Sequence, residues 1–129
     1  MRRIIPIVLT ALLLAACGTV QNVGNLLSSP ATSVALYDAE LGYASTQKLA
    51  LRYYAYCFTN HTYAQILADP VAKPICQTRR TVWRKVQKAD RYALQTITTA
   101  NSVLTSSAVD AAVAAVKAFT GAVPAVPVN

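Results

Sequence analysis

Few residues of this 129-residue chain have the chemistry that catalysis or metal binding requires. The chain has three cysteines, one histidine and five acidic residues, against twelve lysines and arginines. The histidine, His61, belongs to no serine, cysteine or carboxylate arrangement that resembles a nucleophile with its base. Cys57 and Cys76 lack the close spacing of zinc ligands. We therefore expect a non-enzymatic protein without a metal site, a cofactor or a small-molecule substrate.

The remaining cysteine, Cys17, ends the run Leu14-Ala15-Ala16-Cys17 near the N-terminus. Arg2-Arg3 and an apolar segment from Ile4 to Leu14 precede this run, which is the layout of a secretory signal. The apolar segment is much shorter than the roughly 20 residues that a membrane-spanning helix needs. The N-terminal pattern resembles the lipobox of bacterial lipoproteins, and the resemblance covers residues 1–20.

That resemblance has consequences for processing and location. In bacterial lipoproteins the cysteine thiol receives a diacylglycerol, the chain is cut before the cysteine, and the new amino terminus is usually acylated. Residues 1–16 would then be a signal peptide, and the lipid on Cys17 would bind the membrane. Where lipoproteins are sorted by the residue after this cysteine, Asp favours the inner membrane. Gly18 at that position favours the periplasmic face of the outer membrane over the inner membrane.

Cys57 and Cys76 are left as a pair once Cys17 carries lipid. An export compartment favours disulfide formation, and two cysteines allow one intramolecular pairing. We predict a Cys57–Cys76 disulfide, with two free buried thiols as the alternative.

Apolar periodicity and turn residues predict an all-α domain at residues 33–121. A flexible tether at residues 17–32 would precede this domain, and an irregular tail at residues 122–129 would follow it. The expected architecture is a long antiparallel helical hairpin with a short third helix against it, which is a small three-helix bundle. Neither β alternation nor an internal repeat is apparent.

Turn and capping residues set the expected helix bounds. Ser33 is a candidate N-cap for a helix over 33–58, a short helix is expected within 61–67, and Pro74 suits the first turn of a helix reaching residue 105. Ser107-Ala108-Val109-Asp110 has the form of a capping box opening the third helix, and Gly121 is a natural stop.

Three apolar stripes are expected to form the core. The first helix contributes Tyr37, Leu41, Ala44, Leu51, Ala55 and Phe58; the second Val82, Val86, Ala89, Ala93, Ile97, Ala100 and Leu104; the third Val109, Ala112, Val113, Val116 and Phe119.

The second expected helix carries a dense group of cations. The candidate anion-binding residues are Arg79, Arg80, Arg84, Lys85, Lys88 and Arg91. Helical geometry places Arg80, Arg84, Lys88 and Arg91 on one face, opposite the apolar stripe. This face is either ordinary solvated surface or a contact for lipopolysaccharide, anionic lipid or an acidic protein. Nucleic acid is disfavoured, because an exported protein would meet it mainly during DNA transfer or phage entry.

Asp90 lies within the apolar stripe of that helix, where an unpaired charge would be costly. An antiparallel hairpin places Asp90 opposite Tyr43 and about one turn from Lys48. We therefore predict a buried polar contact of Asp90 with Tyr43, Lys48 or both, acting to set helix register.

Three tyrosines lie close together near the end of the first expected helix. They are Tyr53, Tyr54 and Tyr56, and they cannot all face one core stripe, so at least one is expected to be exposed near the turn.

These features favour a membrane-anchored envelope lipoprotein that acts as a helical accessory or adaptor to another envelope component. The alternative functions are an anion-binding module for lipopolysaccharide, anionic lipid or incoming DNA, and a phage- or plasmid-encoded entry or lysis factor.

Overall fold

The computed structural model describes residues 30–128 of the chain. These residues form five α-helices and one π-helical turn, and no strand occurs among them, so the all-α prediction is confirmed. The predicted signal peptide, the lipidation at Cys17 and the first part of the predicted tether lie outside the described residues.

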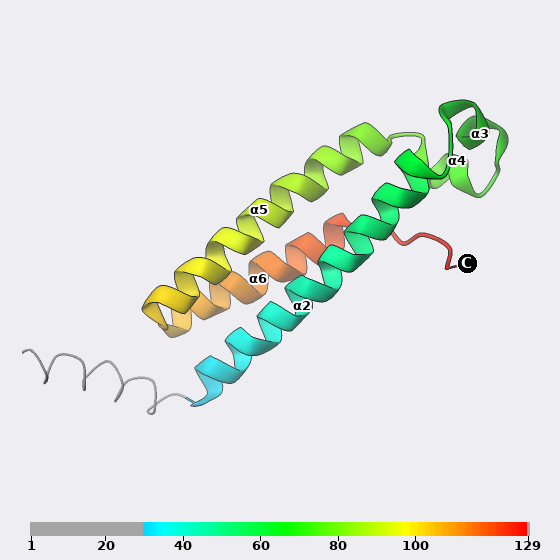
Figure 1. Cartoon of the computed structure of the whole chain (residues 1–129). Coiled ribbons are helices and arrows are strands. Elements are labelled where there is room, and N and C mark those ends of the chain that lie inside the picture. The colour runs from blue at the N-terminus through cyan, green and yellow to red at the C-terminus, as the bar shows by residue number, and fades with distance from the viewer. Residues whose placement is uncertain (1–29, 129) are drawn as a thin grey trace, which may run out of the picture.

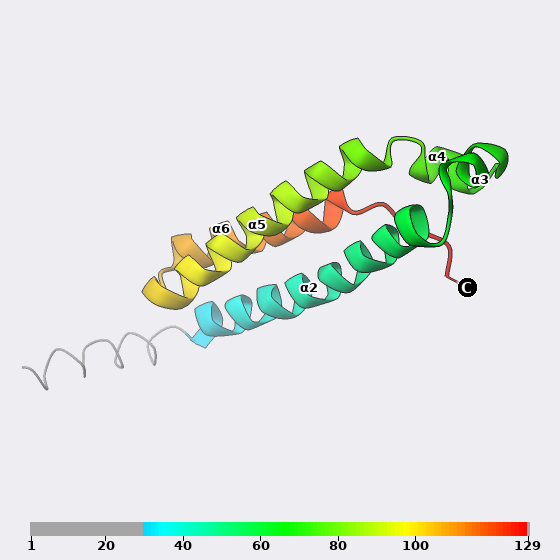
Figure 2. The ribbon, with the colours of Figure 1, turned by 45° about the horizontal axis from the view of Figure 1, so that its top comes forward.

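Three long helices lie side by side (Figures 1 and 2). They are α2 (Pro30–Tyr54), α5 (Arg79–Val103) and α6 (Ser106–Ala122). The short helices α3 (Tyr63–Ala68) and α4 (Ala72–Cys76) form a cap at one end of this bundle. The π-helical turn η1 (Ala55–Thr59) continues α2 into the cap.

The first helix begins earlier than the sequence predicted. α2 is already helical at Pro30, so Ser33 is not its N-cap and residues 30–32 are not part of a tether. Proline suits the first turn of a helix, because its missing N–H would have no partner there and its fixed φ is helical. At the other end, the predicted boundary at residue 58 agrees with η1, which ends at Thr59.

The expected second helix is divided in two. α4 contains Pro74, a turn follows Cys76, and α5 begins at Arg79. The short helix expected within 61–67 is α3, which Thr62 and Gln65 cap reciprocally. Thr62 Oγ1 accepts from the Gln65 N–H at 3.3 Å, and the Thr62 N–H donates to Gln65 Oε1 at 2.8 Å.

A two-residue connection reverses the chain between α5 and α6. Leu104 ends α5 in the left-handed region (φ 45°), and its N–H donates to the Ala100 carbonyl at 2.9 Å. The Thr105 side chain then accepts from the Ala108 N–H and caps α6. The predicted capping box at Ser107 and the predicted stop at Gly121 were therefore wrong, because Thr105 is the N-cap and α6 continues through Gly121 to Ala122.

The predicted apolar stripes of α5 and α6 form the core, but the predicted stripe of α2 does not. Tyr37, Leu41 and Leu51 are 60%, 52% and 65% exposed. The buried face of α2 instead carries mostly small residues; it comprises Leu36, Ala39, Thr46, Ala50 and Tyr53. Small residues are needed there because α2 approaches α6 closely: a Cβ on Gly42 would lie 3.3 Å from Val116 Cγ1. Thr46 and Thr120 share a hydrogen bond of 2.8 Å across the same contact.

Candidate functional site

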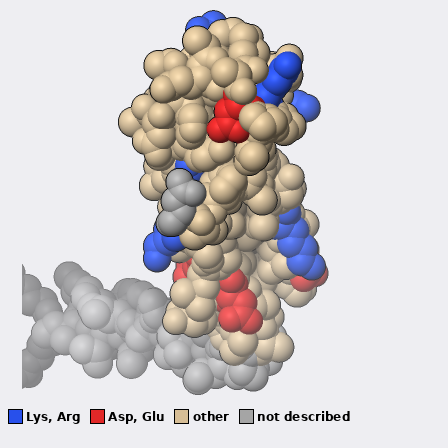
Figure 3. Space-filling model, turned by 90° about the vertical axis from the view of Figure 1, so that its right-hand side faces the viewer, with Lys and Arg blue, Asp and Glu red and all other residues tan. Residues whose placement is uncertain are grey.

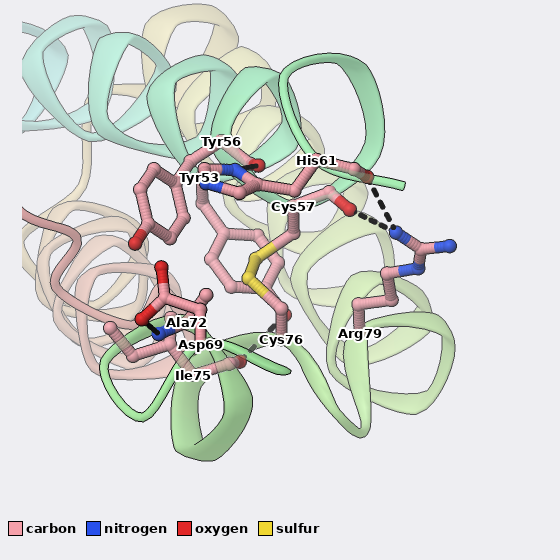
Figure 4. The surroundings of a disulfide bond; sticks show 9 residues. All are labelled: Tyr53, Tyr56, Cys57, His61, Asp69, Ala72, Ile75, Cys76 and Arg79. Atoms are coloured by element: carbon pink, nitrogen blue, oxygen red, sulfur yellow. Dashed lines mark hydrogen bonds between the residues drawn. A yellow bond between two sulfur atoms is a disulfide. The ribbon is translucent and has the colours of Figure 1, made fainter. Parts of the chain in front are cut away.

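The cap is built around a disulfide that links the end of the first helix to α4 (Figure 4). Cys57 and Cys76 are bonded through their sulfur atoms, with their Cα atoms 5.3 Å apart, as the sequence predicted. Both residues are fully buried, together with Tyr53 and Ile66, and form a cluster separate from the main core. The apolar core of this end of the molecule is small, and the disulfide adds a covalent link to it.

The C-terminal segment covers the same cluster. Residues 124–128 after α6 are irregular, as expected, and Val123 and Val126 pack against the cluster of Cys57 and Tyr53. In Figure 1 this segment runs from the end of α6 toward α3 and α4.

Arg79, predicted from the sequence as one of the candidate anion-binding residues, is instead part of the cap. Its guanidinium donates to the carbonyl oxygen of Cys57 and, at 3.4 Å, to that of His61. It also lies over the ring of Phe58, 5.0 Å from the centroid, and 5.7 Å from that of Tyr63. The last carbonyls of a helix lack intrahelical partners and attract positive charge. Arg79 thus caps the first helix from the start of α5.

Two polar residues order the loop on either side of α3. His61 Nδ1 lies 2.8 Å from the carbonyl oxygen of Tyr56, and since a carbonyl can only accept, Nδ1 carries the proton. Asp69 Oδ1 accepts from the N–H groups of Val71 (2.7 Å) and Ala72 (3.2 Å) at the start of α4. These backbone hydrogen bonds lower the pKa of the Asp69 carboxyl below its ordinary value. Both residues have structural roles in the described cap.

Replacing Arg79 with methionine is expected to lower the free energy of unfolding by about 2 kcal/mol. The change retains much of the side-chain volume but leaves two carbonyl oxygens without their charged donor. Urea unfolding of the two proteins measures the loss. The matched control is Arg80→Met, one residue further along and exposed, which should change stability by less than about 0.5 kcal/mol. Equal effects of the two substitutions would contradict the capping role.

Asp90 accepts a hydrogen bond from Tyr43 across the bundle. The hydroxyl of Tyr43 lies 2.9 Å from Asp90 Oδ1 and accepts in turn from Gln47 Nε2 at 2.8 Å. The Tyr43 contact is the one the sequence predicted, whereas Lys48 is exposed on α2 and belongs to another face. Burial, the hydrogen bond to Asp90 and its negative charge together raise the pKa of Tyr43 to about 12.

Tyr43→Phe is expected to reduce stability by about 1 kcal/mol, because Asp90 loses a donor while the ring can still pack 5.7 Å from Phe119. The raised pKa also predicts a pH dependence. The Tyr43 hydroxyl stabilises the folded wild type fully below pH 10, where tyrosine is neutral in both the folded and the unfolded state. This stabilisation is lost as the pH rises toward 12. The difference in the free energy of unfolding between wild type and variant, measured across this range, should therefore become smaller as the pH rises. A difference that grows with pH would contradict a stabilising hydrogen bond from Tyr43 to Asp90.

A shallow cleft of about 300 Å³ lies between α2 and α5, beside this contact. Its lining includes Leu51, Trp83, Val86, Asp90 and Phe119. Trp83 is half-buried, 4.9 Å from the ring of Tyr54, so it packs in the bundle. Tyr54 is 41% exposed, which fulfils the expectation for the tyrosine group. The cleft brings together no pair of groups suited to acid–base chemistry.

The other five cations of the predicted anion-binding set are exposed on α5. They are Arg80, Arg84, Lys85, Lys88 and Arg91. The cap end of the molecule, which faces the viewer in Figure 3, is mostly uncharged, with Lys and Arg side chains scattered over it. The exposed cations therefore do not extend over the cap as one continuous field.

Sequence reasoning placed Arg79 with the solvated cations and missed its role. The signal was present in the spacing, since Arg79 precedes Val82 by three residues and Val86 by seven, which places it on the buried side of α5. His61 and Asp69 gave no comparable signal, because their partners are backbone groups of the loop.

No family model, no curated protein and no solved structure matches this chain. Among the described residues, no group of three or more His, Cys, Asp and Glu side chains could hold a metal ion. Within residues 30–128 no helix is both long enough and apolar enough to cross a bilayer.

Proposed function

We propose that this protein is a non-enzymatic envelope lipoprotein. A lipid on Cys17 would hold a small disulfide-stapled helical hairpin, with α6 against it as a third helix, at the periplasmic face of the outer membrane. The module would act as an accessory or adaptor to another envelope component. The observation that carries the proposal is the buried Cys57–Cys76 disulfide, since disulfides persist in oxidising compartments and are rare in the cytosol. The Leu14-Ala15-Ala16-Cys17 run supplies an independent argument for export and for the anchor.

Thiol trapping in living bacteria tests the compartment. The full chain should be protected from a mass-adding maleimide at Cys57 and Cys76 until a reductant is added. A chain that lacks residues 2–16 is the matched control, because it stays in the cytoplasm and both thiols should then react without reductant. Free thiols in the full chain would contradict an envelope location.

The exposed cations of α5 favour a second candidate, an anion-binding module. Arg80, Arg84, Lys88 and Arg91 follow one another along the side of α5 opposite its buried stripe. Charges in this arrangement would attract lipid headgroups or lipopolysaccharide phosphates, with an affinity that falls as salt rises.

Replacing these four cations with glutamine separates the two candidates. Glutamine keeps the helix-forming tendency, so folding should change by less than about 1 kcal/mol. The second candidate predicts that residues 18–129 bind anionic vesicles in low salt. At about 1 kcal/mol per cation near the surface, the four substitutions should reduce binding by about two to three orders of magnitude. Cosedimentation with vesicles measures the change. Binding that is insensitive to both salt and the substitutions would reject the anion-binding candidate.

A further inference from the structure

The outer face of α2 carries a second apolar stripe, whose large side chains are all more than half exposed. Its members Val34, Tyr37, Leu41 and Leu51 are 59%, 60%, 52% and 65% exposed, and Ala44 is exposed between them. α2 lies at one edge of the bundle (Figure 2), and the stripe lies on the side of α2 opposite its buried face, with Leu51 at the rim of the cleft between α2 and α5. This surface, Val34 to Leu51 along the outer face, is called the outer stripe below.

The outer stripe has the spacing of an apolar stripe on a helix that packs against another helix. Its positions alternate steps of three and four residues, which is the heptad pattern of a coiled-coil seam. Val34, Leu41 and Lys48 occupy the first position of each heptad, and Tyr37, Ala44 and Leu51 occupy the fourth. Lysine at a first position reduces stability and fixes register in such seams. The pattern therefore indicates a helix as the partner of this face.

The charges beside the outer stripe identify which helix fits. Asp38 and Arg52 lie at the fifth heptad position, seven residues before and after Ser45, and all three are exposed. In an antiparallel pair of helices, fifth positions face each other. A two-fold axis close to Ser45 places Asp38 of one chain beside Arg52 of a second copy. By symmetry, Arg52 of the first chain lies beside Asp38 of the second copy. The same register places Leu41 opposite Leu51 of the second copy.

We propose that the outer stripe binds a second copy of this chain through an antiparallel contact of the two α2 helices. The surface is self-complementary in charge, as a two-fold interface requires. A parallel pair would place Glu40 beside Ser45 and Gln47 beside Arg52, without opposite charges. Glu40 already accepts from Asn101 Nδ2 at 2.7 Å within its own chain. The proposal does not depend on lipidation or on the proposed adaptor role.

Site-directed cross-linking of the full chain in living bacteria tests the contact. Ser45→Cys lies beside the proposed axis and should give a dimer with a short bismaleimide. The control Thr98→Cys, exposed on α5, should remain monomeric. The Leu41→Asp and Leu51→Asp double change, in the Ser45→Cys chain, should reduce the dimer at least about tenfold. Leu94→Asp places the same substitution at a residue of α5 that is 50% exposed, and should leave the dimer unchanged.

Charge exchange tests the orientation. Asp38→Arg places arginine beside Arg52 of the second copy at both ends and should weaken the dimer about tenfold. Adding Arg52→Asp should restore it. Sedimentation of the detergent-solubilised full chain provides the second measurement, and circular dichroism checks that each variant is folded. A monomeric mass at all concentrations would overturn the proposal. So would a dimer that ignores the Leu41 and Leu51 substitutions, or one that is weakened by Asp38→Arg and not restored by Arg52→Asp.

Discussion

Replacing both Cys57 and Cys76 with serine is expected to lower the free energy of unfolding by about 3 kcal/mol. The bond joins residues 19 positions apart, and closing a loop of this length removes conformational entropy from the unfolded chain. The loss is large beside the 5–15 kcal/mol that is typical of a whole domain. It should appear as a lower urea midpoint and, because Tyr53 and Ile66 pack around the bond, as easier proteolysis within residues 59–78.

Reduction of the wild-type protein supplies the control for that measurement. A reductant should lower the wild-type midpoint to nearly that of the double serine variant and leave the variant unchanged. If the midpoint of the variant equals that of the oxidised wild type, the disulfide does not stabilise the cap.

Cys17→Ser is expected to abolish stable membrane anchoring by lipid. A single acyl chain gives marginal membrane binding, whereas two or three chains anchor a protein stably. A diacylglycerol with an added N-acyl chain supplies three chains, so the wild type should remain in the membrane fraction after a high-salt wash. The serine variant has no thiol to modify and should be found either released or still carrying residues 1–16.

Cys76→Ser is the matched control, since it also removes one thiol but leaves the N-terminal run intact. It should destabilise the cap and still be retained by the membrane. Retention of an unmodified Cys17→Ser chain that lacks residues 1–16 would show that something other than lipid holds the protein.

Two of the three long helices could be assigned to their core faces from the sequence. In α5 and α6 the large apolar residues and the buried positions coincide, as at Val86, Ile97 and Phe119, so periodicity identified the correct stripe. α2 has apolar residues on two faces. The prediction chose the larger ones, while the close approach of α6 at Gly42 requires the smaller ones.

The cap could be predicted in part. The pairing of Cys57 with Cys76 could be predicted because these are the two cysteines that remain once Cys17 is lipidated. The contact between Asp90 and Tyr43 could be predicted because an antiparallel hairpin places the two residues opposite each other. The role of Arg79 depends on where the chain turns after Cys76, and the sequence predicted an uninterrupted helix there. An arginine that caps a helix distant in sequence is identified only when the ends of both helices are known.

We propose that lipid on Cys17 holds this helical protein in the cell envelope. The mass of the N-terminal peptide, measured on protein purified from bacterial membranes, shows whether Cys17 carries this lipid. We expect a peptide that begins at Cys17 and carries the added mass of a diacylglycerol, usually with one further acyl chain. An unmodified peptide that begins at Met1, or one that begins at Cys17 with a free thiol, would contradict it.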